Sequence, residues 1–159
     1  MTDYKNLKLI ASSSPHIRAK DDTRSIMIDV CIAMLPALFV SCFVFGIQAL
    51  VLTVISVVSC VFWEWLYRKL MKKSCSVGDF SAVVTGMLLA FVCPVSLPWW
   101  AIVIGAFFSI VVVKQLYGGI GCNFANPAIT ARVFMLVAFG SMTTQAFPTI
   151  VDSVSSATP

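Results

Sequence analysis

The sequence predicts an all-α integral membrane protein with about five transmembrane helices, and three observations support that fold class. Hydrophobic residues make up 59% of the 159-residue chain and charged residues only 11%, and the mean hydropathy is +0.94. A soluble domain carries roughly 25% charged residues, so these few charges cannot cover a surface that faces water. Two stretches of 34 residues each contain no charge at all, and polar segments flank them.

Residues 1–25 are a polar tail of mixed charge, without the apolar segment of a secretory signal. We expect this tail to remain in the cytoplasm, where it is made. Its one histidine, His16, lies in the polar segment SSSPHIR and is more typical of a solvated side chain than of a catalytic one. The sequence shows no Ser–His–Asp or Cys–His set, so we assign no catalytic residue.

The first uncharged stretch, Val30–Trp63, is too long for one crossing. As a single helix it would extend about 50 Å, whereas the hydrocarbon core of a bilayer is about 30 Å thick. The chain must therefore turn back, and Gly46 in the segment FGIQ is the best breaker. With the flanking apolar residues included, the pattern predicts helices over 26–45 and 47–67.

The second uncharged stretch, Phe80–Val113, is interrupted by Pro94 and Pro98 in the segment CPVSLPWW. The helix before these prolines is short for a full crossing, which indicates a broken or half-length helix. Two tryptophans follow the prolines, as at a membrane interface. One more apolar stretch comes near the end of the chain. The predicted membrane domain, 26–147, is completed by helices over 81–95, 99–115 and 127–146.

The positive charges orient the bundle, because cytoplasmic loops of membrane proteins carry an excess of Lys and Arg. The tail holds five of the eleven, and the loop after the second helix holds four. The other two are Lys114, at the end of the fourth helix, and Arg132, a turn into the fifth. All eleven basic residues lie on one side of the membrane or within a few turns of it, and we expect that side to be the cytoplasm. Five crossings then place 148–159, with Thr158, outside.

The six cysteines are scattered, without a CxxC pair or clustered histidines, so we expect no metal or iron–sulfur site. Five of them lie in or beside apolar stretches and are typical of small packing residues. The formal net charge of +4 is explained by the orientation of the bundle. Nucleic-acid binding is therefore not expected.

The segment YGGIGCNFANPA, residues 117–128, is the first candidate ligand site. Gly118 and Gly119 allow a ligand to approach the backbone closely, and Asn123 and Asn126 supply amide groups. Asn126 followed by proline is typical of a helix start, and a helix that starts at membrane depth points free N–H groups at whatever lies there. The alternative is a plain cytoplasmic turn between two helices, which the residue types alone favour.

Thr85 and Gly86, inside the third predicted helix, are a second candidate pair. Small residues in such a helix usually mean close helix packing rather than ligand binding. Three charges, Asp29, Glu64 and Arg132, lie at membrane edges. Asp29 and Glu64 are within about a turn of their helix ends, which favours snorkelling or pairing with nearby Lys and Arg. Arg132 lies a turn into its helix, and a charge at that depth more often indicates a functional role.

The chain ends on DSVSSATP, which is too polar for a further crossing. Thr158 precedes a proline and is therefore pushed out of helical geometry, which suits an enzyme that modifies its hydroxyl. The segment resembles the S-[GS]-A-T flavinylation motif with a preceding acidic residue, in which the phosphate of FMN esterifies the threonine. Ser156 stands where that motif mostly has glycine. The matching residues are Asp152, Ser155, Ser156, Ala157 and Thr158.

Three further segments carry a resemblance to one family, in which they recur in the same order: SSSPHIR with IMIDVCIAMLPA, then DFSAVVTGMLLAFVCPVSLPWW, then YGGIGCNFANPA. From about Ile10 onward the chain resembles the family that contains the D subunit of the Rnf complex and the B subunit of the Na⁺-translocating NADH:quinone reductase. The short tail before the first helix favours the Rnf form. Members are about twice as long, with roughly ten helices in two inverted five-helix repeats. The resemblance implies that this chain is the amino-terminal half.

The resemblance also implies a function: a membrane flavoprotein that carries electrons across the membrane in an ion-translocating (Na⁺ or H⁺) ferredoxin:NAD⁺ oxidoreductase. FMN would be linked to Thr158. A non-covalent riboflavin would lie nearer the cytoplasmic side, framed by the 118–126 segment and by Thr85 and Gly86. The chain would act with other membrane subunits, including an extracytoplasmic flavin-bearing subunit, and with membrane lipid, and would not be catalytic alone. The alternatives are a cofactor-free transporter or channel half-repeat and a scaffold subunit, neither of which needs the SSAT tail.

Overall fold

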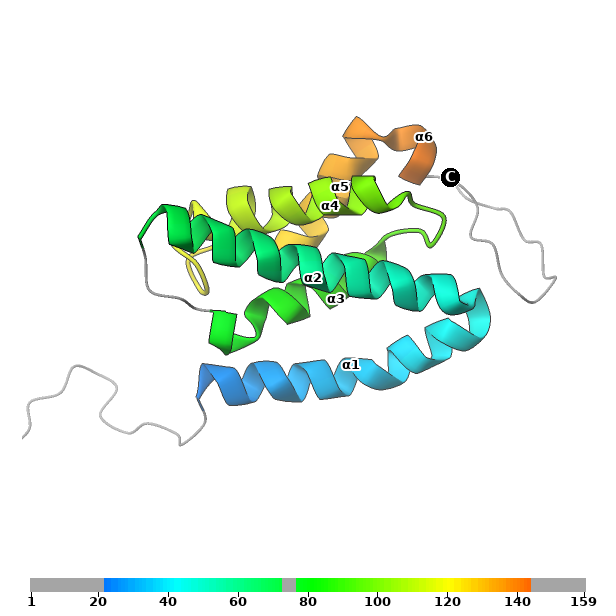
Figure 1. The fold of residues 1–159 in the computed structure, drawn as a ribbon, viewed down its shortest axis with the longest axis horizontal. Helices are drawn as coiled ribbons and strands as arrows, with labels where there is room; N and C mark the ends of the chain where they lie inside the picture. The colour runs from blue at the N-terminus through cyan, green and yellow to red at the C-terminus, as the bar shows by residue number, and fades with distance from the viewer. Residues whose placement is uncertain (1–21, 73–76, 144–159) are drawn as a thin grey trace, which may run out of the picture.

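The structure, a computed structural model, describes residues 22–72 and 77–143, and the chain is mostly helical within these ranges. The helices form an elongated bundle in which α1 and α2 run antiparallel (Figure 1). In chain order the helices are α1 (Thr23–Phe45), α2 (Ile47–Leu70), the short helix η2 (Val77–Asp79), α3 (Ser81–Val92), α4 (Trp99–Phe107), the π-helix η3 (Phe108–Gln115), α5 (Pro127–Ala138) and α6 (Gly140–Thr143).

The first two helices follow the expected ranges 26–45 and 47–67 and extend them at the polar ends. Among the described helices, α1 and α2 are long and apolar enough to cross a membrane, with 23 and 24 residues. Gly46 is the single residue between them. Its φ is 77°, a conformation that glycine adopts without a steric penalty. The Asp22 side chain caps α1 by accepting a hydrogen bond from the backbone N–H of Thr23.

The third helix ends at Val92, before the end of the expected range 81–95. Cys93 has an extended backbone because it precedes Pro94, and proline disfavours helical geometry in the residue before it. With 12 residues, α3 is about 18 Å long and too short to cross a bilayer core of about 30 Å. The structure thus has the half-length helix that the two prolines predict.

The last expected helix, 127–146, is divided in the structure. It begins at Pro127 as predicted, but α5 ends at Ala138 and the short helix α6 follows from Gly140. Phe139 leaves helical geometry, and Gly140 has the backbone freedom that makes such a break inexpensive. Residues 144–146 lie outside the described ranges.

The expected helix 99–115 is continuous but changes its type. It starts as an α-helix directly after Pro98 and continues from Phe108 as a π-helix, in which hydrogen bonds span five residues instead of four. Nothing in the apolar pattern of this stretch predicts that change.

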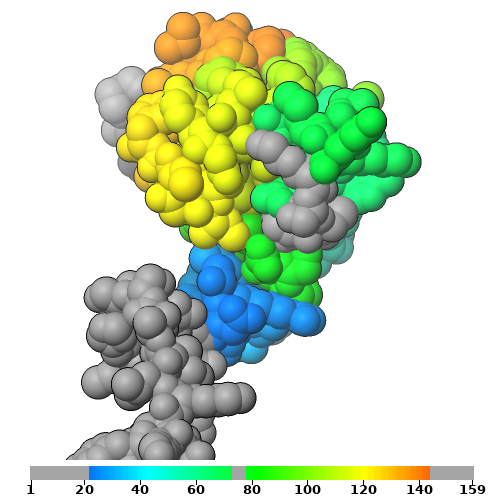
Figure 2. Space-filling view, turned by 90° about the vertical axis from the view of Figure 1, so that its left-hand side faces the viewer, coloured from blue at the N-terminus to red at the C-terminus, as the bar shows by residue number. Residues whose placement is uncertain are grey.

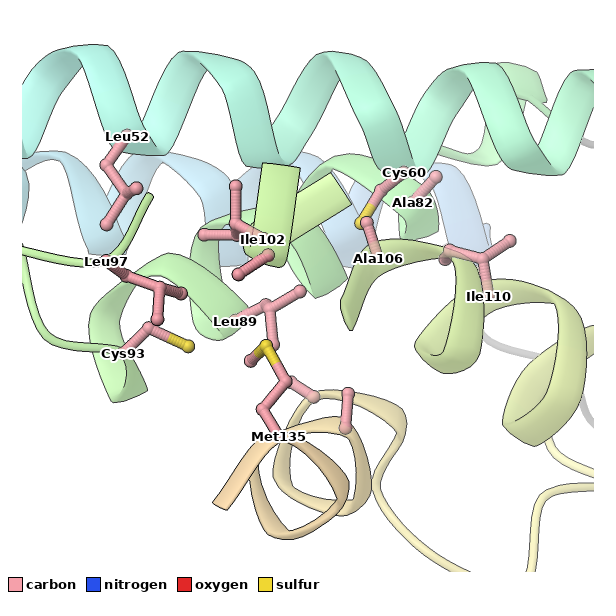
Figure 3. Close-up of a cluster of buried hydrophobic side chains, with 13 residues drawn as sticks. Leu52, Cys60, Ala82, Leu89, Cys93, Leu97, Ile102, Ala106, Ile110 and Met135 are labelled. Carbon is pink, nitrogen blue, oxygen red and sulfur yellow. The ribbon is translucent and has the colours of Figure 1, made fainter. Parts of the chain in front are cut away.

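The core lies between α2, α3, α4, η3 and α5 (Figure 3). Leu89, Ile102 and Met135 come from three different helices and meet there with no exposed surface. By contrast, α1 has no buried residue, and Phe39 and Phe43 are 66% and 68% exposed. An apolar helix that is left so bare is suited to contact with lipid or with another hydrophobic segment.

The bundle has two distinct ends. The start of α1, the end of α2 and the loop before α5 lie together at one end, and the α1–α2 turn, the α3–α4 loop and the last described residues lie toward the other (Figure 1). Figure 2 looks onto the first end, where residues 116–126 form a large part of the surface. Arg24, Arg68 and Lys69 belong to the helix ends that meet there, and Lys72 lies in the turn that follows α2.

Candidate functional site

A buried ion pair lies inside the bundle, near the end at which the loop before α5 is found. Glu64 of α2 has no exposed surface, and Lys114 of η3 is only 2% exposed. Lys114 Nζ donates to Glu64 Oε2 at 2.9 Å and to Ser81 Oγ at 2.7 Å. Gln115 Nε2 donates to the other carboxylate oxygen at 2.9 Å. The four side chains therefore tie α2, the start of α3 and η3 together.

The electrostatics of this cluster depend on complete pairing. Taking two charges out of water is costly, and their attraction compensates only when hydrogen bonds satisfy the remaining polar atoms. Both oxygens of Glu64 accept such bonds, and Arg68 Nε lies 3.9 Å from Oε1, one turn further along α2. Of the two expectations for Glu64, pairing with Lys and Arg is confirmed, whereas snorkelling is wrong because the side chain has no exposed surface. Its main partner, Lys114, is distant in the sequence and was not predicted as its partner.

The π-helix brings two consecutive side chains onto the same carboxylate. Lys114 and Gln115 both lie in η3, and each donates to a different oxygen of Glu64. A π-helix is rare, and it occurs frequently at functional sites. The bond from the N–H of Gly119 to the Lys114 carbonyl, 3.0 Å long, continues the five-residue spacing into the loop.

The shape of the loop before α5 depends on the backbone conformations of its glycines and on the side-chain amide of Asn123. Gly118, Gly119 and Gly121 have φ values of 111°, 101° and 83°, which favour glycine over any other residue. The Asn123 amide, oriented so that its nitrogen faces carbonyl oxygens, donates to Lys114 O at 3.2 Å and to Gly119 O at 3.1 Å. Asn123 therefore closes the loop back onto the end of η3.

Asn126 serves as the N-cap of α5, as the Asn–Pro pair predicts. Its Oδ1 accepts a hydrogen bond of 3.0 Å from the N–H of Ala128, and Pro127 occupies the first helical turn. The side chains of Asn123 and Asn126 thus shape the loop. The backbone of Gly119 lies beside Arg68, because a methyl group at this glycine would be 3.4 Å from Arg68 Nη2.

Thr85 and Gly86 lie deeper, in the contact between α3 and α2. A Cβ atom on Gly86 would be 2.7 Å from the Cα of Val57, so the two backbones touch. Ser56 Oγ donates to the Gly86 carbonyl at 2.8 Å, and the Thr85 hydroxyl donates to the Ser81 carbonyl. The structure agrees with the interpretation as helix packing and leaves no space for a ligand between Gly86 and α2.

Two other predicted sites lie elsewhere. Arg132 projects from α5, and its Nη2 donates to the Thr143 carbonyl at 3.2 Å. The expected attachment residues, Ser155, Ser156, Ala157 and Thr158, are outside the described ranges. The helix α6, with which the described chain ends, lies toward the end of the bundle opposite the glycine-rich loop (Figure 1).

Comparison with known proteins places these features in one family. The chain matches the NQR2, RnfD, RnfE family over residues 10–159. It belongs to that family. It is 53% identical over 96% of its length to the D subunit of the Na(+)-translocating ferredoxin:NAD(+) oxidoreductase complex of Acetobacterium woodii, of which the match covers 48%. Together with its apolar helices, membership indicates an integral membrane protein.

Two further relatives show the spread of this similarity. The chain is 37% identical over 98% of its length to the D subunit of the proton-translocating ferredoxin:NAD(+) oxidoreductase complex of Clostridium ljungdahlii, with 47% of that protein covered. It is 40% identical over 91% of its length to the D subunit of the ion-translocating oxidoreductase complex of Shewanella amazonensis, with 42% covered. The chain thus spans about half the length of the curated relatives it matches.

Proposed function

We propose that this chain is part of a membrane subunit that carries electrons across the membrane in an ion-translocating ferredoxin:NAD⁺ oxidoreductase of the Rnf type. The observation that carries the proposal is the 53% identity to the D subunit of such a complex over nearly the whole chain. The other membrane subunits of the complex, including an extracytoplasmic flavin-bearing one, are then its partners. The relatives are named for Na⁺ and for protons, so either ion suits the proposal.

The cofactor in this proposal is FMN, linked through its phosphate to Thr158, with a non-covalent riboflavin near the glycine-rich loop. The support is the sequence of the tail, Ser155–Thr158 with Asp152 before it. When bound, a flavin accepts and returns the electrons, and the protein contributes position and electrostatics. An extracytoplasmic Thr158 and a cytoplasmic loop would place the two flavins toward opposite faces of the membrane.

The buried cluster positions the loop in this scheme. The side chain of Lys114 is anchored on Glu64 and Ser81, and its backbone carbonyl accepts hydrogen bonds from Gly119 and Asn123. One residue thus couples the bundle core to the loop. A riboflavin there would meet the Gly118–Gly119 backbone and Arg68, whereas Thr85 and Gly86 are engaged in helix packing.

The test is in-gel fluorescence of the full-length protein from a host that contains the flavin-attaching enzyme. After denaturation, the wild-type band should fluoresce under ultraviolet light and the Thr158→Ala band should not. Thr149→Ala, which removes a threonine that lies before the flavin motif and not in it, is the matched control and should fluoresce. A wild-type band without fluorescence, with the attaching enzyme shown to be active, would refute the flavin proposal.

A cofactor-free transporter half is the second candidate, and one observation favours it. Both α3 and α5 have only 12 residues, and the N-terminus of α5 is capped by the side chain of Asn126. Transporters use such discontinuous helices to bind substrates at membrane depth. A non-fluorescent wild-type protein would leave this candidate, or a scaffold subunit, in the lead.

A further inference from the structure

The outward face of α2 is an apolar stripe that ends in a lysine. Five large apolar side chains recur along it at the three- and four-residue spacing that keeps them on one side of a helix: Val51, Val54, Val58, Phe62 and Trp65. Each of them is between 41% and 61% exposed. Lys69 follows Trp65 by four residues, so it continues the same stripe, and it is also exposed.

An open groove runs along the half of this stripe that is nearer to Lys69. Only apolar side chains line it: Val57, Val58, Val61, Phe62 and Trp65. From Val57 to Lys69 the helix rises by about 18 Å, which is close to the hydrocarbon depth of one leaflet, about 15 Å. The groove therefore has the length of an acyl chain that lies along α2 below a headgroup.

Lys69 brings a positive charge to the end of this groove. Its Nζ lies 4.6 Å from the centre of the Trp65 ring, which is one of the groove walls. Within the described ranges the ion pairs join Glu64 to Arg68 and to Lys114, and none involves Lys69. Lys72 is exposed in the turn after α2, where its backbone N–H donates to the Lys69 carbonyl at 3.4 Å. Two neighbouring cations thus lie where the apolar groove ends.

We propose that the groove and these two lysines bind an anionic phospholipid, with an acyl chain in the groove and the headgroup phosphate at Lys69 and Lys72. Basic residues next to a membrane helix attract anionic lipids, and tryptophan is typical of the headgroup level. The proposal depends on α2 crossing the membrane and is independent of the flavin.

The side chains of the stripe favour a lipid over another helix as the occupant. Helices that pack together in membranes use small residues at their contact. On its inner side α2 does so with α3, where Gly86 lies against the backbone of Val57. The outward stripe has only valine, phenylalanine and tryptophan before its lysine. A flexible acyl chain can fill the spaces between such large side chains, whereas a second helix could not approach closely.

The test measures how brominated lipids quench the fluorescence of Trp65 in the full-length protein. Bromine on an acyl chain quenches a tryptophan that it contacts. The protein is reconstituted into phosphatidylcholine vesicles that contain increasing fractions of brominated phosphatidylglycerol, or of brominated phosphatidylcholine with the same acyl chains. The signal of Trp65 is the difference between each protein and its Trp65→Phe counterpart. Phosphatidylglycerol should reach half-quenching at a fraction about fivefold lower, the change in affinity expected for one lysine near an anionic lipid.

Three variants assign this preference to Lys69. Lys69→Gln should bring the two lipids to nearly equal quenching, and Lys69→Arg, which keeps the charge, should retain most of the preference. Arg24→Gln is the matched control. It removes an exposed cation at the same end of the bundle that lies over the Phe80 ring and not at the groove, and it should behave as wild type. Unchanged quenching by phosphatidylcholine verifies that Lys69→Gln is folded.

Each other outcome overturns the inference. Equal quenching by both lipids in wild type would show that the groove meets bulk lipid without selecting a headgroup. Absence of quenching by either lipid would show that protein covers the stripe, either the rest of the full-length subunit or a partner. A preference for phosphatidylglycerol that persists in Lys69→Gln would place the headgroup at other residues.

Discussion

The buried polar contacts of this protein depend on a few individual side chains, and Glu64 is the clearest example. The sequence predicts that it either snorkels or pairs with nearby Lys and Arg, and Arg68, one turn away, is such a neighbour. The contact with Lys114 could not be predicted, because it depends on how α2 and η3 pack and on the π-helical turn that aims Lys114 at the carboxylate. Local chemistry along one helix is visible in a sequence, whereas a partner on another helix is not.

Replacing Glu64 by Gln should destabilise the protein strongly. The substitution keeps the shape of the side chain but leaves Lys114 as an uncompensated buried charge, and breaking such a pair costs roughly 3–5 kcal/mol. The measurement is the unfolding midpoint of the purified protein. Asp29→Asn, which removes an exposed carboxylate from α1, is the matched control and should change the midpoint little. Equal effects of the two substitutions would contradict the structural role of the cluster.

The ends of the helices can be predicted from the sequence where a single residue at that position, such as a glycine, a proline or a capping asparagine, determines them. Gly46 and Pro94 end α1 and α3 close to the expected positions, and Asn126 caps α5 through its own side chain. The break at Phe139 and the π-helix do not follow. Phe139 packs edge-to-face on Trp100, and Arg132 holds the Thr143 carbonyl, so tertiary contacts accompany that break. The sequence predicts where the helices begin more reliably than how they bend.

The contact between α2 and α3 depends on the absence of a side chain at Gly86. Gly86→Ala should lower stability, because the new methyl group would lie 2.7 Å from the Cα of Val57, and backbone cannot yield as a flexible side chain would. Overpacking of this kind costs about 1–3 kcal/mol. Gly78→Ala is the control, since its new methyl group would meet no atom within 4 Å. The unfolding midpoint should fall for Gly86→Ala and hold for Gly78→Ala; the reverse order would contradict the close packing of these helices.

The whole molecule has two chemically different ends. The basic residues of the helix ends gather at one of them, whereas the α3–α4 loop at the other carries two prolines and no charge, and two tryptophans begin α4 directly after it. A charge asymmetry of this kind is what orients membrane proteins, with the basic end in the cytoplasm. The sequence alone predicts this asymmetry, because the positions of Lys and Arg relative to the apolar stretches are enough.

Cysteine labelling tests this orientation in the full-length protein within its native membrane. Cys122, exposed in the loop before α5, is kept as the single cysteine of one variant, and Ser96→Cys, exposed in the α3–α4 loop, supplies the single cysteine of the other. Because the two loops lie toward opposite ends of the bundle (Figure 1), a maleimide that cannot cross membranes should reach them from opposite sides. We expect it to label Cys122 only in inverted vesicles and Ser96→Cys only on intact cells stripped of their outer envelope. Labelling of both from the same side would contradict the two-ended bundle itself. A clean reversal would keep the bundle but turn it over, and would bring Thr158 to the cytoplasmic face, where an extracytoplasmic flavin partner could not reach it.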